Sequence, residues 1–244
     1  MKLNYSIIIP TLNEERLLPK LMSQLNDNSL RESFDYEIIV SDGGSSDNTV
    51  IIAADLADKV ITHKKESKQN ISEGRNNGAK IAKGEILIFL NGDIFIEEPQ
   101  KFFSYIESKF MNSKYLAMTC SVVVFPNERK FIDSVFLTFY NYYFHSLNII
   151  GLGMGRGECH IIRKDIFWNQ NGYNEKLAAG EDYDLYKRIR QKGKILFAQK
   201  LFIFESPRRY RKLGHFRILF TWLINSIFVT LKNRSMSKEW EQIR

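Results

Sequence analysis

The fold of this chain is indicated most clearly by the stretch Glu85-Ile-Leu-Ile-Phe-Leu-Asn-Gly-Asp-Ile-Phe-Ile96. Its unbroken apolar run, Ile86 to Leu90, is typical of a strand that is buried on both faces of a helix-covered parallel sheet. Asn91-Gly92-Asp93 follows directly and places a carboxylate where the strand leaves the core. Ligands of open α/β sheets bind just outside the carboxyl ends of the strands. Asp93 is therefore a candidate to hold a divalent cation or a ribose, and an ordinary Asn-Gly-Asp turn is the alternative.

Strand-like and helix-like segments alternate on both sides of this turn. The expected strands cover residues 5–9, 36–40, 60–63 and 85–90, and the expected helices begin near Glu15, near Asn48 and at Asn70. Asn13 is a candidate N-cap for the first helix, with acidic residues in its first turn. This alternation predicts an α/β fold with a doubly wound, mostly parallel sheet flanked by helices.

The second half of the chain is less regular. It contains an amphipathic helix at 99–110, a strand at 116–125, a long aromatic segment at 131–150, a strand at 158–163 and an amphipathic helix at 181–191. A basic run at 207–212 then precedes an apolar segment at 216–231. We therefore expect the chain to end in a basic and apolar helical segment.

Composition limits the partners and the compartment. The formal charge of +7 suits anionic partners such as phosphates or an acidic membrane surface. Nucleic acid is not expected, because no motif for it occurs. The two cysteines form no disulfide framework, and residues 1–10 do not resemble a secretory signal. A cytoplasmic protein is the simplest interpretation.

Five motifs in a fixed order resemble the inverting glycosyltransferases of family 2, which share the GT-A fold. They are Ile7-Ile-Ile-Pro-Thr-Leu-Asn-Glu-Glu15, Val40-Ser-Asp-Gly-Gly-Ser-Ser-Asp-Asn-Thr49, Gly74-Arg-Asn-Asn-Gly-Ala79, Phe89-Leu-Asn-Gly-Asp93 and Gly180-Glu-Asp182. The resemblance implies a GT-A domain over residues 1–206, with a donor-binding half (1–98) and an acceptor-binding half (99–206), followed by the segment 207–244. It also implies a nucleotide-diphosphate sugar as donor and a divalent metal, Mn²⁺ or Mg²⁺, as cofactor.

The resemblance also assigns roles to residues. Asp93 matches the metal-binding acid of the family's DXD-type motif, whose first acid is replaced here by Asn91. Asp42 matches the acid that reads the nucleotide base, and Arg75 matches a basic position near the pyrophosphate. The donor site is expected to comprise Pro10, Thr11, Asn13, Glu14, Asp42, Arg75, Asn91, Gly92 and Asp93. A turn acid at Asp42 and a helix-dipole acid at Glu14 are the structural alternatives.

The acceptor side is expected to contain the catalytic base. Inverting transfer requires one group to take the proton from the acceptor hydroxyl, and Asp182 matches the family's base at the start of a helix. A helix-capping acid is the alternative. Gly157, Glu158 and Glu181 are assigned to the acceptor side, and His215 is a candidate second metal ligand.

Two interpretations of the C-terminal segment stay open. A basic cluster followed by an aromatic and apolar helix fits a segment lying at the inner face of a membrane. The same pattern fits a helix packed on the core or on a second subunit, as in a homodimer. The acceptor is either a sugar or a lipid-linked molecule. A nucleotidyltransferase and a catalytically inactive nucleotide-sugar-binding module are the alternative functions.

Overall fold

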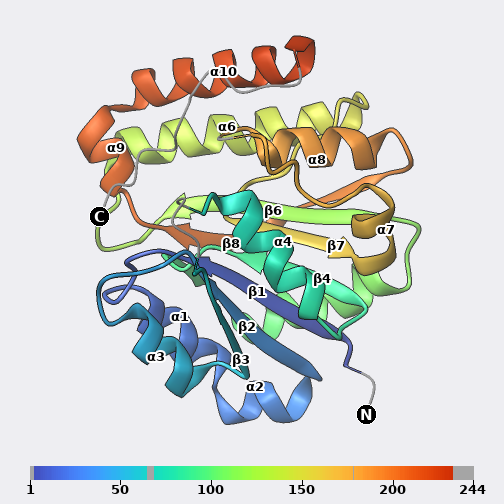
Figure 1. Ribbon diagram of the computed structural model, residues 1–244. Helices are drawn as coiled ribbons and strands as arrows, with labels where there is room; N and C mark the ends of the chain where they lie inside the picture. The colour runs from blue at the N-terminus through green and yellow to red at the C-terminus, as the bar shows by residue number, and fades with distance from the viewer. Residues whose placement is uncertain (1–2, 65–68, 178, 233–244) are drawn as a thin grey trace.

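The computed structural model describes residues 3–64, 69–177 and 179–232 (Figure 1). Within these residues an eight-stranded mixed sheet has the strand order β3-β2-β1-β4-β7-β6-β8-β5. The strands are β1 (Tyr5–Thr11), β2 (Tyr36–Asp42), β3 (Lys59–Thr62), β4 (Ile86–Leu90), β5 (Ile94–Ile96), β6 (Ala117–Val124), β7 (Cys159–Arg163) and β8 (Ile195–Glu205). The helices are α1 (Leu18–Leu25), α2 (Asn28–Ser33), α3 (Thr49–Leu56), α4 (Ile71–Ile81), α5 (Pro99–Tyr105) with a π-helical continuation (Ile106–Met111), α6 (Phe131–Ile149), α7 (Lys164–Asn169), α8 (Glu181–Arg190), α9 (Arg208–Leu213) and α10 (His215–Lys232).

The first four strands form the parallel part of the sheet. β1 lies between β2 and β4, and β3 pairs with β2, all in parallel. Successive side chains of a strand point to opposite faces. Ile8 therefore packs in the cluster that contains residues of α4 and α8, while Ile7 and Ile9 pack with residues of α1 and α5. Both faces are apolar and covered, which explains the unbroken apolar runs in the sequence. The α/β fold expected from the alternation is confirmed.

The sheet changes direction next to β4. β7 runs antiparallel to β4 and pairs Cys159 with Leu90. β6 is antiparallel to β7, β8 is parallel to β6, and β5 is antiparallel to β8. The sheet is therefore mixed, and the parallel arrangement covers mainly its first half. This reversal brings the segment before β7, which contains Gly157 and Glu158, beside the carboxyl end of β4.

Some local predictions were wrong. The first helix begins at Leu18, its N-cap is Leu17, and Asn13 does not cap it. Asn13 instead has a left-handed backbone (φ 55°), and its Oδ1 accepts a hydrogen bond from the Ser46 N–H at 2.8 Å. This hydrogen bond links the loop after β1 to the loop after β2. Because residue 13 is used in this link, helix α1 begins only at Leu18. The sequence analysis assigned neither β5 nor β8, because each depends on pairing with a distant segment.

Two long helices form a layer over one part of the sheet. Figure 1 shows α10 running alongside α6, and the ring centroids of Tyr140 on α6 and Trp222 on α10 lie 5.2 Å apart. Among the residues described, no helix has both the length and the apolarity to cross a bilayer. Residues 233–244 of the predicted C-terminal segment lie outside the described residues. The proposed division into 1–98, 99–206 and 207–244 stays a prediction.

The close approach of Gly84 to β1 generates a stability prediction. A Cβ atom at Gly84 would lie 2.3 Å from the Tyr5 carbonyl carbon and 2.5 Å from the Ser6 nitrogen. Backbone atoms of a central strand cannot move aside, so we expect Gly84→Ala to lower the free energy of unfolding by about 1–3 kcal/mol. Urea denaturation measures the change. Lys83→Ala, at the exposed neighbouring position, is the control, and equal stability of the two variants would contradict this packing.

Candidate active site

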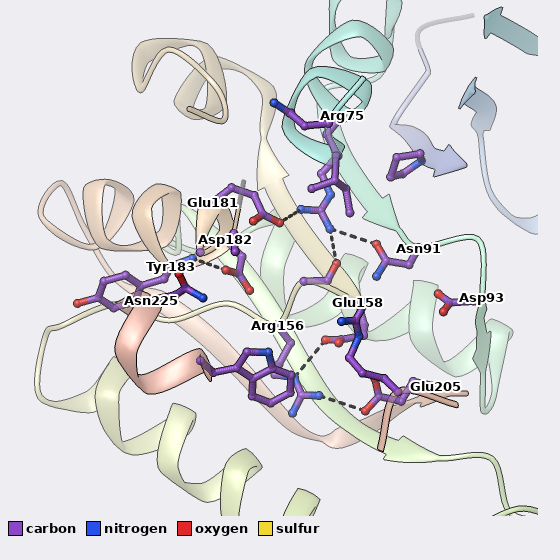
Figure 2. Close-up of a pocket in the computed structure, with 18 of the residues that line it drawn as sticks. Arg75, Asn91, Asp93, Arg156, Glu158, Glu181, Asp182, Tyr183, Glu205 and Asn225 are labelled. Carbon is purple, nitrogen blue, oxygen red and sulfur yellow. Dashed lines mark hydrogen bonds and ion pairs between the residues drawn. The ribbon is translucent and has the colours of Figure 1, made fainter. Parts of the chain in front are cut away.

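A cavity of about 1220 Å³ opens at the carboxyl ends of β1, β2 and β4. Most of the sequence-predicted site residues line it. They are Pro10, Thr11, Glu14, Arg75, Asn91, Gly92, Asp93, Gly157, Glu158, Glu181 and Asp182. Residues far apart in the sequence thus meet in one place, as Figure 2 shows for the polar residues that it labels.

Three predicted residues do not line this cavity. The Asp42 carboxylate is fully buried and accepts hydrogen bonds from the backbone N–H groups of Gly44 and Ser45, both at 2.8 Å. It therefore shapes the loop whose neighbouring residues Ser41 and Gly43 do line the cavity. Asn13 ties the same loop to β1, as described above.

His215, the candidate second metal ligand, contacts the Asp133 carboxylate. Its Nε2 lies 2.7 Å from Asp133 Oδ1, and its ring stacks on Tyr210 with a centroid distance of 5.1 Å. Burial opposes ionisation of Asp133, but hydrogen bonds from Arg211 and the Lys130 backbone hold the pKa of this carboxyl at about 2. In this arrangement His215 belongs to an anchor between α6 and the C-terminal helices and does not reach the cavity.

The Arg75 guanidinium connects the segments around the cavity. This side chain is 1% exposed; it donates to Glu181 Oε1 at 2.9 Å, to Asn91 Oδ1 at 3.1 Å and to the Gly157 carbonyl at 2.6 Å. Gly74 and Gly78 flank it on α4, and a Cβ at Gly78 would lie 2.4 Å from Ile8 Cγ2. The bare glycine face therefore lets α4 pack closely on β1, which carries Arg75 into the interior.

Asp182 and Glu181 lie together at the N-terminus of α8. Glu181 is ion-paired with Arg75, whereas the backbone N–H of Tyr183 donates to Asp182 Oδ1 at 2.8 Å. Burial and the adjacent Glu181 charge raise the pKa of Asp182 to about 7. A carboxylate with such a pKa can accept a proton near neutral pH. The two neighbouring acids therefore differ in character: Glu181 is ion-paired, and Asp182 is able to accept a proton.

Asp93 and Glu14 share one cation in the structure. Arg208, at the start of α9, donates to Asp93 Oδ2 at 2.8 Å and to Glu14 Oε1 at 2.8 Å. The sequence predicted only that Arg208 belongs to a basic run before an apolar segment. The structure instead brings it to the mouth of the cavity, while Arg211 pairs with Asp133.

A second buried charge cluster was missed in the sequence. Arg156 contacts Glu158 at 3.1 Å and Glu205 at 3.4 Å, and Tyr210 donates to Glu205 at 2.6 Å. Burial and the nearby Glu158 raise the pKa of Glu205 to about 8. Burial opposes ionisation of Glu158 as well, but Arg156 holds its pKa below the usual value. Glu205 ends the unpredicted strand β8, so no local motif pointed to it.

The oxygen ligands at the mouth of the cavity fit a hard divalent cation. Asp93 and Glu14 supply two carboxylates that already share a positive charge. Across the described part of the chain, no three His, Cys, Asp or Glu side chains gather into a metal site by themselves. Mg²⁺ is commonly held by one or two carboxylates together with substrate phosphates and water. Asp93 therefore fits a metal ion that binds together with a diphosphate.

The family model for glycosyl transferase family 2 matches residues 6–169. Because this match covers well over half of the chain, the chain belongs to glycosyl transferase family 2. The family that the motifs implied is therefore confirmed.

Two relatives by sequence are also named glycosyltransferases. A PGL/p-HBAD biosynthesis glycosyltransferase of Mycobacterium bovis is 36% identical over 93 residues, which cover 36% of this chain and 35% of that protein. A 4,4'-diaponeurosporenoate glycosyltransferase of Staphylococcus haemolyticus is 34% identical over 107 residues, which cover 42% of this chain and 28% of that protein. The chain thus spans about a third of the length of these relatives.

Solved structures confirm the GT-A fold. The mannosyltransferase PcManGT of Pyrobaculum calidifontis, in complex with GDP-Man and Mn²⁺, has a TM-score of 0.67 at 16% identity and covers 90% of this chain and 65% of that one. Glucosyl-3-phosphoglycerate synthase of Mycobacterium tuberculosis, in complex with Mn²⁺, UDP and glucosyl-3-phosphoglycerate, has a TM-score of 0.61 at 16% identity and covers 93% of this chain and 78% of that one. At these identities the likeness concerns the fold alone.

The Arg208 contacts generate a prediction about metal affinity. A guanidinium on Asp93 competes with a divalent ion for the same carboxylate, so Arg208→Gln is expected to bind Mn²⁺ severalfold more tightly in the absence of donor. The measurement is the rise in melting temperature with Mn²⁺ concentration, because a ligand of the folded state stabilises it. Arg211→Gln, on the same helix but paired with Asp133, is the control. An unchanged or weaker response of Arg208→Gln would show that the guanidinium does not compete.

Proposed function

We propose that this chain transfers a sugar from a nucleotide-diphosphate sugar to an acceptor hydroxyl, with inversion at the anomeric carbon and Asp182 as the base. The observation that carries the proposal is the shared cavity, which contains both the proton-accepting Asp182 and the metal-compatible Asp93. The family membership supports the reaction class. Structural relatives in complex with GDP-Man or with UDP support a nucleotide-sugar donor.

The proposed transfer replaces the bond from the anomeric carbon to the diphosphate with a bond to the acceptor oxygen. The acceptor hydroxyl gives its proton to the Asp182 carboxylate, and its oxygen forms a bond to the anomeric carbon. The bond between that carbon and the diphosphate oxygen breaks, and the electron pair leaves with the nucleoside diphosphate. Attack from the face opposite the leaving group inverts the configuration. General-base assistance of this kind typically accelerates a reaction by about 10²–10⁴-fold.

Positive charge near the leaving group is the second requirement. A divalent ion bound at Asp93 would act as a Lewis acid that stabilises the departing diphosphate. Arg208 and Arg209 line the same part of the cavity and supply fixed cations. Arg208 also donates to Glu14, so its guanidinium would keep a partner in the cavity when a divalent ion takes its place on Asp93. Cations held close to a leaving group stabilise the negative charge that develops in the transition state.

Arg75 is proposed as a positioning residue. Its contacts hold Glu181 beside Asp182 and hold Asn91 next to the Asp93 turn. The Asn91 amide oxygen accepts from the guanidinium, so the residue that replaces the family's usual acid still has a structural partner. The presence of both Asp93 and Asp182 in one cavity favours an active enzyme over an inactive binding module.

Asp182→Asn is the variant that tests the base. The amide preserves size and hydrogen bonding but does not accept a proton at neutral pH, so turnover should fall by about 10²–10⁴-fold. Donor affinity, measured by thermal shift with a panel of nucleotide sugars, should be nearly unchanged because Asp182 is proposed to face the acceptor. Loss of donor affinity with turnover preserved at saturating donor would make Asp182 a donor ligand instead.

The raised pKa of Asp182 predicts a pH profile. Since the ionised carboxylate is the active form, kcat/KM should fall about tenfold per pH unit below pH 7 and level off above it. The residual activity of Asp182→Asn should lack this limb. A wild-type profile that stays flat down to pH 5 would contradict the assignment.

A further inference from the structure

The cavity continues beyond the polar site into an apolar arm between α6 and α10. We call this arm the aromatic groove and define it by six lining residues: Phe139, Tyr143, Leu147, Leu152, Leu219 and Trp222. The total volume, about 1220 Å³, exceeds the range of roughly 300–1,000 Å³ that is usual for a pocket holding one small ligand. The cavity therefore has room for a donor and a second molecule together.

The walls of the groove are flat and aromatic. The rings of Phe139 and Tyr143 are nearly parallel, at an interplanar angle of 5°, and Trp222 packs edge-on against Tyr140. Phe139 is 61% exposed and Tyr143 is 41% exposed. Burying apolar surface stabilises a complex by about 25 cal/mol per Å². Exposed aromatic rings that line a cavity therefore indicate an apolar ligand rather than core packing.

The inner end of the groove is polar. Asn225 of helix α10 is 2% exposed, and Figure 2 shows it pointing towards the part of the cavity that holds Asp182 and Tyr183. All three residues line the same cavity as the aromatic side chains. The aromatic groove and the proposed base therefore belong to one continuous cavity.

We propose that the acceptor is an amphiphile, with a hydroxyl-bearing head at Asp182 and an extended apolar tail along the aromatic groove. This assignment rests on the proposed transferase function, because it places the attacking hydroxyl at the base. An acceptor without a tail would leave the groove unfilled. The tail therefore contributes binding energy that the head alone does not supply, and the groove selects acceptors by their apolar part.

Binding of a brominated alkyl chain tests the groove without any knowledge of the true acceptor. The probe is a dibrominated dodecyl β-maltoside, used below its critical micelle concentration, whose bromine atoms quench tryptophan fluorescence on contact. We expect saturable quenching that is largely lost in Trp222→Phe. Within a series of unbrominated alkyl maltosides that displace the probe, affinity should rise roughly fourfold for each added methylene until the groove is filled.

Two substitutions inside the groove and one outside it complete the test. Tyr143→Asp and Phe139→Asp place a charge on the apolar wall, so each should weaken probe binding by about tenfold or more. Tyr142→Asp is the matched control, because Tyr142 is 62% exposed on the same helix and does not line the cavity. Phe139 is equally exposed, so its replacement does not depend on repacking of the core. Melting temperatures confirm that the variants are folded.

The possible results distinguish a failure of the groove proposal from a failure of the proposed transferase function. Probe binding that is lost in the two groove variants and kept in Tyr142→Asp, in a protein whose melting temperature also rises with a nucleotide sugar, supports the proposal. Donor binding without saturable quenching, or equal loss in Tyr142→Asp, overturns the groove and leaves the transferase function standing. Probe binding in a protein that responds to no nucleotide sugar overturns the transferase function, and with it the assignment to an acceptor.

Discussion

The buried guanidinium of Arg75 is the interaction on which the site depends. It ties α4 to Glu181 at the start of α8, to Asn91 after β4 and to the Gly157 carbonyl before β7. A charge without partners in the interior is strongly destabilising, and removing one member of a buried pair costs about 3–5 kcal/mol. The protein therefore adopts the arrangement in which all three segments meet the guanidinium, and that arrangement assembles the cavity.

The electrostatics of the cavity follow from this arrangement. Arg75 holds Glu181 beside Asp182, and burial together with the Glu181 charge raises the pKa of Asp182 to about 7. At the other end of the cavity Arg208 balances Asp93 and Glu14. In the proposed reaction, the Asp182 side of the cavity accepts the proton and the Arg208 side receives the diphosphate. The C-terminal helices contribute to both ends, because α9 carries Arg208 and α10 carries Asn225.

The features that the sequence predicted correctly are those set by a local pattern of residues. Apolar runs identified the strands β1, β2 and β4, and the motifs placed Asp93, Arg75 and Asp182 in one site. The sequence failed where a contact joins distant segments. Arg208 was predicted only as part of a basic run, because nothing near it in the chain reveals Asp93, which lies 115 residues away. For the same reason His215 was assigned to the metal, although its partner is Asp133, and Glu205 was missed at the end of β8.

The pH profile of Glu181→Gln tests most directly whether the charge of Glu181, which is paired with Arg75, raises the pKa of Asp182. The amide oxygen of the new glutamine can still accept a hydrogen bond from Arg75. The substitution removes the negative charge that raises the pKa of Asp182. The acid limb of kcat/KM should therefore move below its wild-type position near pH 7, while the same substitution at the remote, exposed Glu32 leaves it in place. A limb that stays at the wild-type pH in Glu181→Gln would contradict the coupling between the Arg75 ion pair and the base.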